Sequence, residues 1–241
     1  MHIPVAHLPI PGVNNPVVMV NVDEIRVDVY VEVVLLGGRD RIEVPGVLGE
    51  YLLMFKKSLE KLLARSFSLI CYGSSDYDVL AYTVATNKIL KELSGSLSED
   101  ELRIASSIDL EMGLPGYVSA SRYSPVLASH YAWRYGEPLV DLGLETVFKL
   151  RSFKAVGELD QPFLDVSKEA ISHLAGRSSV LLARAITEGD VGTIRQIVRF
   201  VNGLWHSVYG LKVPCGESTS LYVPGLSKVY CAELEVSPRT S

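Results

Sequence analysis

Hydrophobic and polar residues alternate between Ile25 and Leu36, where polar side chains such as Arg26 and Glu32 are interleaved with valines. A period of two residues is typical of a β-strand that buries one face. Two glycines come next, and the stretch 41–44 has the same alternation. The pattern therefore predicts a β-hairpin whose second strand is 41–44.

Apolar residues then recur every three or four positions over 48–65, with lysines between them, which indicates an amphipathic helix. A short apolar strand is predicted at 67–72 and a second helix at 76–93. The residues Ser98-Glu99-Asp100-Glu101 have the pattern of a capping box, so a third helix should begin there and end near Glu111.

The first 16 residues contain four prolines and can form at most an edge strand or a loop. The later pattern predicts four strands, at 129–135, 146–153, 218–223 and 229–236, and three helices, at 163–175, 178–188 and 191–208. This order favours an α+β fold, with helices gathered on one side of a largely antiparallel sheet, over strict βαβ alternation.

The chain has 241 residues, of which 48% are hydrophobic, as expected for a globular protein with one large core or two smaller lobes. No apolar run reaches the length of a membrane span, and the first residues lack the charge of a signal peptide, so we expect a cytoplasmic protein that does not enter membranes. A net charge of -5 with interspersed signs disfavours nucleic acid as a partner. The presence of only two glutamines favours a thermophilic source.

The three cysteines, Cys71, Cys215 and Cys231, are too few and too scattered to suggest a disulfide framework, so we expect buried thiols. The five histidines are isolated from one another, which disfavours a metal site made of imidazoles.

The residues Gly73-Ser74-Ser75 lie between the strand predicted at 67–72 and the helix predicted at 76–93. Such a junction can hold a phosphate through unpaired amides at the positive end of the helix dipole. The same residues can equally form an ordinary helix cap, which needs no ligand. Asp76 and Asp78 would repel a phosphate in the absence of Mg²⁺.

In its wider context the chain resembles the GHMP small-molecule kinases, the superfamily of galacto-, homoserine, mevalonate and phosphomevalonate kinases. The resemblance is carried by short motifs in the family's order: Gly-Ser-Ser at 73–75, "NKILKEL", "LSEDELRIAS", "GLPG" at 113–116 and "AITEGDVGTIRQIVRFVN" at 185–202. It implies a lobe like ribosomal protein S5 domain 2 at 1–145 and a ferredoxin-like lobe at 146–241.

The resemblance also implies a ligand for each motif. ATP would lie against Gly73, Ser74, Ser75 and Gly216, the glycine that remains of the family's third motif. Mg²⁺ would be held by Ser75 and Asp109, with Glu111 as the second choice of carboxylate. The substrate would meet Gly113, Gly116 and Ser119.

The stretch 117–135 is rich in aromatic residues and can be either a packed core or a pocket, in which Arg122 would pair with an anionic substrate group. Two functions follow. The first is an ATP-dependent kinase that phosphorylates a hydroxyl of a small metabolite. The alternative is a non-catalytic binding or regulatory protein, because the glycines that precede Gly73 in the family are missing and no acid or base follows the "GLPG" loop. A homodimer is also expected.

Overall fold

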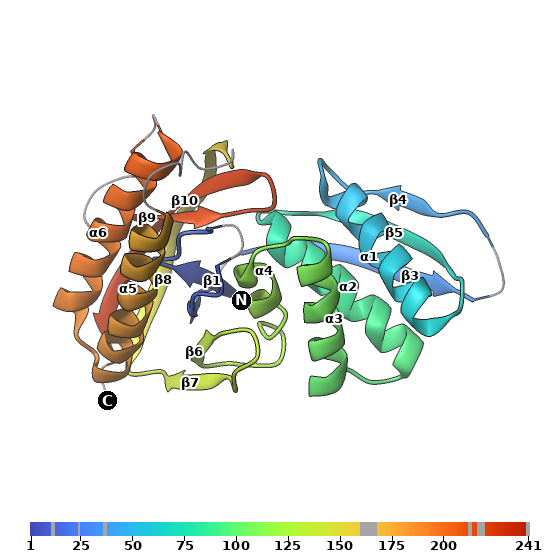
Figure 1. Ribbon diagram of the computed structural model, residues 1–241, viewed down its shortest axis with the longest axis horizontal. Helices are drawn as coiled ribbons and strands as arrows, with labels where there is room; N and C mark the ends of the chain where they lie inside the picture. Colours follow the sequence, from blue (N-terminus) through green and yellow to red (C-terminus); the bar gives the residue numbers. More distant parts are fainter. Residues whose placement is uncertain are drawn as a thin grey trace. The chain divides into compact units, whose positions relative to one another are not determined.

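The computed structural model describes residues 1–10, 13–23, 25–35, 38–159, 168–211, 214–215 and 220–239 (Figure 1). The chain divides into two compact units. The terminal unit consists of Met1–Glu24 and Val126–Ser241, and the inserted unit is Ile25–Pro125. The division into lobes after residue 145 stays a prediction, and the units described below are those of the structure.

The inserted unit contains a three-stranded sheet and four helices within its described residues. Its elements are β3 (Val27–Val34), β4 (Arg41–Glu43), α1 (Leu48–Leu63), β5 (Ser68–Ser75), α2 (Asp78–Ser94), α3 (Glu99–Glu111) and α4 (Gly116–Ser121). The strand order is β3-β5-β4. The sheet is thus mixed, because β5 is antiparallel to β3 and parallel to β4.

The hairpin predicted for 25–36 and 41–44 is wrong, because β5 lies between its two expected strands. The register of the β4–β5 pair places Ile42 opposite Cys71. Parallel strands need a long crossover, and α1 supplies it. The buried side chains of Leu69 and Cys71 suit β5 to the central position.

Three helices of the inserted unit, α1, α2 and α3, follow the predicted pattern closely, whereas α4 was not predicted. α1 buries the apolar stripe Leu48, Leu52, Phe55 and Leu59, as its spacing predicts. α2 is buried over most of its surface and contacts α1, β3 and β5, which makes it the core helix of this unit. α3 begins with the predicted capping box, in which the Glu101 carboxylate accepts a hydrogen bond of 2.8 Å from the Ser98 amide.

The terminal unit contains two antiparallel sheets and two long helices within its described residues. The strands β1 (His2–Val5), β2 (Val17–Asn21), β6 (His130–Trp133) and β7 (Val140–Gly143) pair in the order β1-β2-β6-β7. The strands β8 (Thr146–Glu158), β9 (Ser220–Pro224) and β10 (Lys228–Pro238) pair in the order β8-β10-β9. Helices α5 (Lys168–Glu188) and α6 (Val191–Tyr209) run side by side (Figure 1).

The N-terminal segment forms the edge strand β1, as predicted. The two helices predicted at 163–175 and 178–188 are instead the single helix α5, whose path continues through Gly176. Residues 163–167 of the first predicted helix lie outside the described residues. A glycine inside a helix costs about 1 kcal/mol, which is too little to break a helix whose buried face packs on neighbouring elements.

The mixed arrangement of helices and largely antiparallel sheets confirms the α+β class predicted from the sequence. In the terminal unit the core includes Trp205 of α6, whose indole donates a hydrogen bond of 3.1 Å to the carbonyl of His7. Among the helices that the structure describes, none has both the length and the apolar character needed to cross a bilayer.

Candidate functional site

The proposed phosphate junction is part of a β-ladder in this structure. Gly73, Ser74 and Ser75 are the last three residues of β5, and they pair with Val27–Val29 of β3. The strand therefore continues beyond Tyr72, where the sequence pattern placed its end, and α2 begins only at Asp78. A glycine-rich loop of the kind that surrounds a phosphate is replaced here by extended, paired backbone.

The close approach of β3 explains why residue 73 is a glycine. Gly73 has φ +149°, and a Cβ atom added to it would lie 2.0 Å from the carbonyl oxygen of Asp28. No side chain fits that space. The contact continues past the end of the ladder, because the Asp76 amide donates to the carbonyl of Arg26, the residue before β3, at 3.1 Å and the Asp76 carboxylate accepts from the Arg26 amide at 3.1 Å.

Two side chains of the same segment accept hydrogen bonds from amides around the start of α2, although the side chain of its N-cap residue, Tyr77, makes no capping bond. The Ser75 hydroxyl accepts a hydrogen bond of 3.0 Å from the Tyr77 amide. The Asp78 carboxylate accepts one of 2.9 Å from the Val79 amide. The amides of residues 76, 77 and 79 thus already have acceptors, and an acidic side chain lies at the positive end of the helix dipole. Ser75 therefore bonds the turn that leads into α2 rather than an amide within the helix.

Three of the predicted site residues, Asp109, Ser119 and Arg122, come together in the inserted unit. Arg122 donates to both carboxylate oxygens of Asp109, from Nε at 2.7 Å and from Nη2 at 2.6 Å. Ser119 Oγ donates to the same carboxylate at 3.1 Å, and the Tyr82 hydroxyl donates to it at 2.8 Å. The side chains of Asp109 and Arg122 are completely buried. We call these four residues the Asp109–Arg122 cluster.

The other side of the Arg122 guanidinium is also occupied. Its Nη1 donates to Thr86 Oγ1 at 2.8 Å and to Asn87 Oδ1 at 3.1 Å. The rings of Phe55 and Tyr82 lie 5.1 and 5.4 Å from the guanidinium carbon, which is the range of cation–π contacts. A buried ion pair is tolerated only when its remaining donors and acceptors find partners, and this one meets that condition.

The electrostatics of the cluster hold the charges in place. Burial alone would lower the pKa of the Arg122 guanidinium, but the adjacent Asp109 carboxylate outweighs it and the pKa is raised. Burial and the same carboxylate raise the pKa of the Tyr82 hydroxyl, which therefore stays protonated and donates. The Mg²⁺ role of Asp109 and the substrate roles of Ser119 and Arg122 stay predictions. A ligand here would have to displace bonds that the cluster already makes.

The "GLPG" loop connects α3, which carries Asp109, to α4. Gly113 has φ +74°, a conformation that favours glycine, and the Leu114 amide donates to the Asp109 carbonyl at 2.8 Å. Pro115 then caps α4, whose first residue is Gly116. The substrate roles of the two loop glycines stay predictions, and Glu111 is exposed at the end of α3.

Gly216, the predicted remnant of the third motif, lies outside the described residues. Within the part of the chain that the structure describes, no group of three or more histidine, cysteine, aspartate or glutamate side chains is arranged to hold a metal ion.

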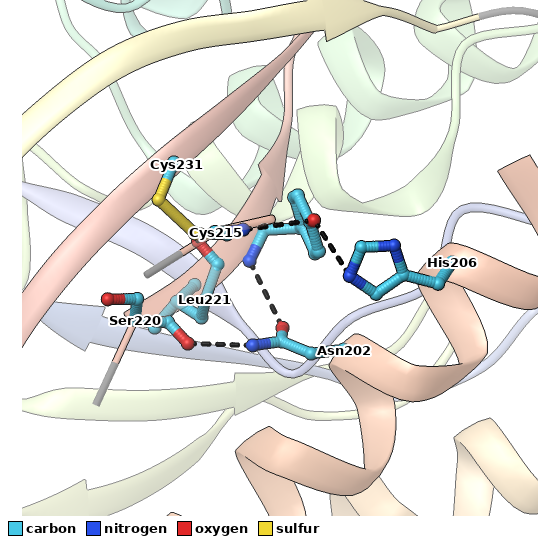
Figure 2. The surroundings of a disulfide bond; sticks show 7 residues. Asn202, His206, Cys215, Ser220, Leu221 and Cys231 are labelled. Atoms are coloured by element: carbon cyan, nitrogen blue, oxygen red, sulfur yellow. Dashed lines mark hydrogen bonds between the residues drawn. A yellow bond between two sulfur atoms is a disulfide. The ribbon is translucent and has the colours of Figure 1, made fainter. Parts of the chain in front are cut away.

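A disulfide in the terminal unit corrects the prediction of three buried thiols. Cys215 and Cys231 are bonded, with their Cα atoms 5.2 Å apart, while Cys71 is a free and buried thiol as expected. The disulfide joins Cys215, which precedes β9, to Cys231 of β10, and both cysteines are buried (Figure 2).

Helix α6 fixes the chain around this disulfide (Figure 2). Asn202 Nδ2 donates to the Ser220 carbonyl at 2.7 Å, and Asn202 Oδ1 accepts from the Tyr222 amide at 3.3 Å. The Tyr222 hydroxyl accepts from the Cys215 amide at 3.0 Å and lies 3.1 Å from His206 Nε2. The side chain of Asn202 thereby bonds the backbone of β9 much as a neighbouring strand would.

Comparison with known proteins gives a fold and no closer relative. No family model matches the sequence, and no curated protein matches it. Mevalonate diphosphate decarboxylase from Staphylococcus aureus is similar over 100% of this chain and 94% of its own, with TM-score 0.60 and 9% identity. D-glycero-D-manno-heptose 1-phosphate kinase from Bacteroides thetaiotaomicron is similar over 91% of this chain and 79% of its own, with TM-score 0.52 and 14% identity.

A third similar structure is MDDEF in complex with MVAPP, AMPPCP and magnesium, which covers 99% of this chain and 87% of its own, with TM-score 0.58 and 9% identity. These proteins confirm the GHMP resemblance at the level of the fold. The chain has the fold of GHMP-type small-molecule kinases and of the decarboxylases that share it.

Proposed function

We propose that this protein is a non-catalytic binding or regulatory protein built on the GHMP kinase-like fold, and that the junction at 73–75 does not hold a nucleotide. The observation that carries the proposal is the pairing of Gly73–Ser75 with β3. Fold alone does not decide function, because one architecture hosts many. The chemistry of the junction therefore has more weight than the similarity of the fold.

A phosphate at this junction would face two costs. Hydrogen-bonded anion binding at a helix start needs amides without other partners, and those of residues 76, 77 and 79 are already bonded within the protein. Asp76 and Asp78 would add charge repulsion. A metal that used Asp109 to offset this repulsion would leave the buried Arg122 without its counter-ion.

ATP-dependent phosphorylation of a metabolite hydroxyl is the second candidate. It is favoured by the likeness of the whole chain to a heptose 1-phosphate kinase and to a complex that contains AMPPCP and magnesium. Under this candidate the nucleotide would lie at Gly73, Ser74, Ser75 and Gly216, Mg²⁺ at Ser75 and Asp109, and the substrate at Gly113, Gly116, Ser119 and Arg122. The pairing of Gly73–Ser75 with β3 and the bonds within the Asp109–Arg122 cluster are the reasons for ranking this candidate second.

Thermal unfolding with Mg-ATP separates the two candidates. A ligand present at 100 times its Kd adds about 2.7 kcal/mol of stability, which corresponds to a rise in Tm of about 5–10 °C for a chain of this size. We expect no rise with 5 mM Mg-ATP relative to the same concentration of magnesium sulfate. A nucleotide-binding kinase measured in parallel shows that the assay detects binding.

A rise in Tm that Ser75→Glu abolishes would overturn the proposal and support the kinase. Ser96→Glu is the matched control, since Ser96 is exposed in the loop after α2 and away from the junction. A rise that survives in both variants would place a nucleotide site elsewhere in the chain, which also contradicts the proposal. The expected homodimer stays a prediction that light scattering of the purified protein can test.

A further inference from the structure

A groove of about 630 Å³ runs along α5 in the terminal unit. Its volume lies within the range of small-molecule sites. The wall opposite α5 comes from Asn15, Pro16 and Arg134. None of its lining residues belongs to the inserted unit, so the groove is separate from the residues discussed for nucleotide and substrate.

The wall of the groove is fixed to α5 by a specific contact. Asn15 Nδ2 donates to the Ser172 carbonyl at 3.0 Å. The approach depends on Gly176, because a Cβ atom there would lie 2.9 Å from Asn15 Oδ1. Gly176, an unfavourable residue inside a helix, therefore has a packing role, and the two walls are held at a defined separation.

Two of the residues that line the groove, Arg134 and Arg177, are arginines with unused donors. Arg134 is oriented by its Nε bond to the Asn14 carbonyl and by its Nη1 bond to Glu137, both 2.8 Å long. Its Nη2 has no acceptor among the described residues. Arg177 is exposed and has no ion-pair partner in that same part of the chain. Guanidinium groups of this kind suit carboxylates and phosphates, which they bind through paired hydrogen bonds.

The remaining lining residues differ between the two ends of the groove, with apolar side chains at one end and an acidic side chain at the other. Val180 and Leu181, at the C-terminal end, expose 61% and 53% of their surface. Glu169 lies two turns before Arg177, at the other end. An anionic group is therefore favoured at the arginines and an apolar group next to Val180 and Leu181, while Glu169 disfavours a second negative charge beyond them.

We propose that this groove binds a small amphipathic anion, a carboxylate or a phosphate monoester that carries an apolar chain. Its charged group lies between Arg177 and Arg134, and its apolar part covers Val180 and Leu181. The inference goes beyond the proposed function and does not depend on the nucleotide question, because none of the lining residues of the groove is among those assigned to the nucleotide.

Isothermal titration at low ionic strength tests the site with three probes: octanoate, octyl phosphate and 1-octanol. We expect at least one of the two anions to bind tenfold more tightly than 1-octanol, and the comparison between them identifies the preferred headgroup. Arg177→Gln should weaken that binding about tenfold. Arg184→Gln is the matched control, because Arg184 lies on the same helix, is exposed and pairs with Glu188 outside the groove.

Three results would overturn the inference. One is the absence of binding of both anions at 5 mM. Another is equal affinity for 1-octanol and the anions, which would indicate an apolar surface only. The last is an equal effect of the Arg177 and Arg184 substitutions. Neither arginine is buried, so loss of folding is not expected to obscure the comparison, and circular dichroism of each variant checks this.

Discussion

Removal of the Cys215–Cys231 bond should destabilise the terminal unit by a magnitude that follows from the chain length it closes. The two cysteines are 16 residues apart. In the chain-entropy account a loop of this length stabilises the folded state by about 3 kcal/mol, because the cross-link restricts the unfolded chain. The perturbation is the double variant Cys215→Ala, Cys231→Ala, which removes the cross-link without placing a polar hydroxyl in the buried site.

Urea unfolding followed by circular dichroism, with and without 10 mM TCEP, measures the effect. We expect the free energy of unfolding of wild type to fall by about 3 kcal/mol on reduction. The double variant should have the value of reduced wild type, with or without reductant. Cys71→Ala is the control, because it removes the buried free thiol and leaves the cross-link. Its response to reductant should equal that of wild type.

Thiol titration of the denatured, unreduced protein provides an independent check. We expect one reactive thiol, that of Cys71. Three reactive thiols, or a wild-type stability that does not change with reductant, would refute the reasoning. The bond also bears on location, because the cytosol of most cells keeps thiols reduced while hyperthermophiles retain intracellular disulfides. The expected cytoplasmic location is therefore compatible with this disulfide only together with the other expectation, a thermophilic source, which rests on the small number of glutamines.

Asp109→Ala should lower the free energy of unfolding by about 3–5 kcal/mol, since it leaves the buried Arg122 charge unpaired. Denaturant titration measures this loss. A loss below about 1 kcal/mol would contradict the structural role of the cluster. Gly73→Ala should cost about 3 kcal/mol, because its Cβ would meet the carbonyl of the facing strand. Gly95→Ala, at φ +81° in open space, should cost only about 1 kcal/mol, and equal losses would show that β3 does not approach so closely. Burial lowers the pKa of His7 to about 4, so the unfolded state takes up a proton first as the pH falls below about 6.5. Stability should therefore drop by about 2 kcal/mol between pH 7 and pH 5, and a His7→Phe variant with the same drop would contradict this assignment.

Much of the secondary structure could be predicted because it depends on local periodicity. The alternation in β3, the apolar stripe of α1 and the capping box of α3 are each contained in a few consecutive residues. The break predicted between residues 175 and 178 was wrong, because a contact distant in the sequence decides the local structure there. Gly176 is an unfavourable helix residue by itself, but its missing side chain makes room for Asn15, far away in the sequence.

The candidate site shows the same limit. Gly73, Ser74 and Ser75 have the composition of both a phosphate loop and a helix cap, and local sequence does not distinguish them. In the structure all three residues pair with β3, a contact that neither local pattern predicts. Asp109 was predicted as a metal ligand from the family resemblance, and Arg122 as a substrate ligand from its charge. Their bidentate contact depends on α3 and α4 meeting over α2, which no short motif encodes.

The disulfide was missed for want of any local signal. Cys215 precedes β9 and Cys231 lies within β10, so their contact requires the β9–β10 pairing and the side chains of α6 that hold β9. The number of cysteines does not indicate which two are bonded. The pair is identified only by the short distance between Cys215 and Cys231 in the folded chain.

By itself the sequence determined where most of the helices and strands form, the α+β class and the resemblance to GHMP-type proteins, because these follow from periodicity and short motifs within one segment. The tertiary structure decided the strand order β3-β5-β4, the partner of each buried charge and the bonded pair of cysteines. The physical reason is that these features are contacts between residues distant in the chain. Their free energy exists only when the core that joins them has formed.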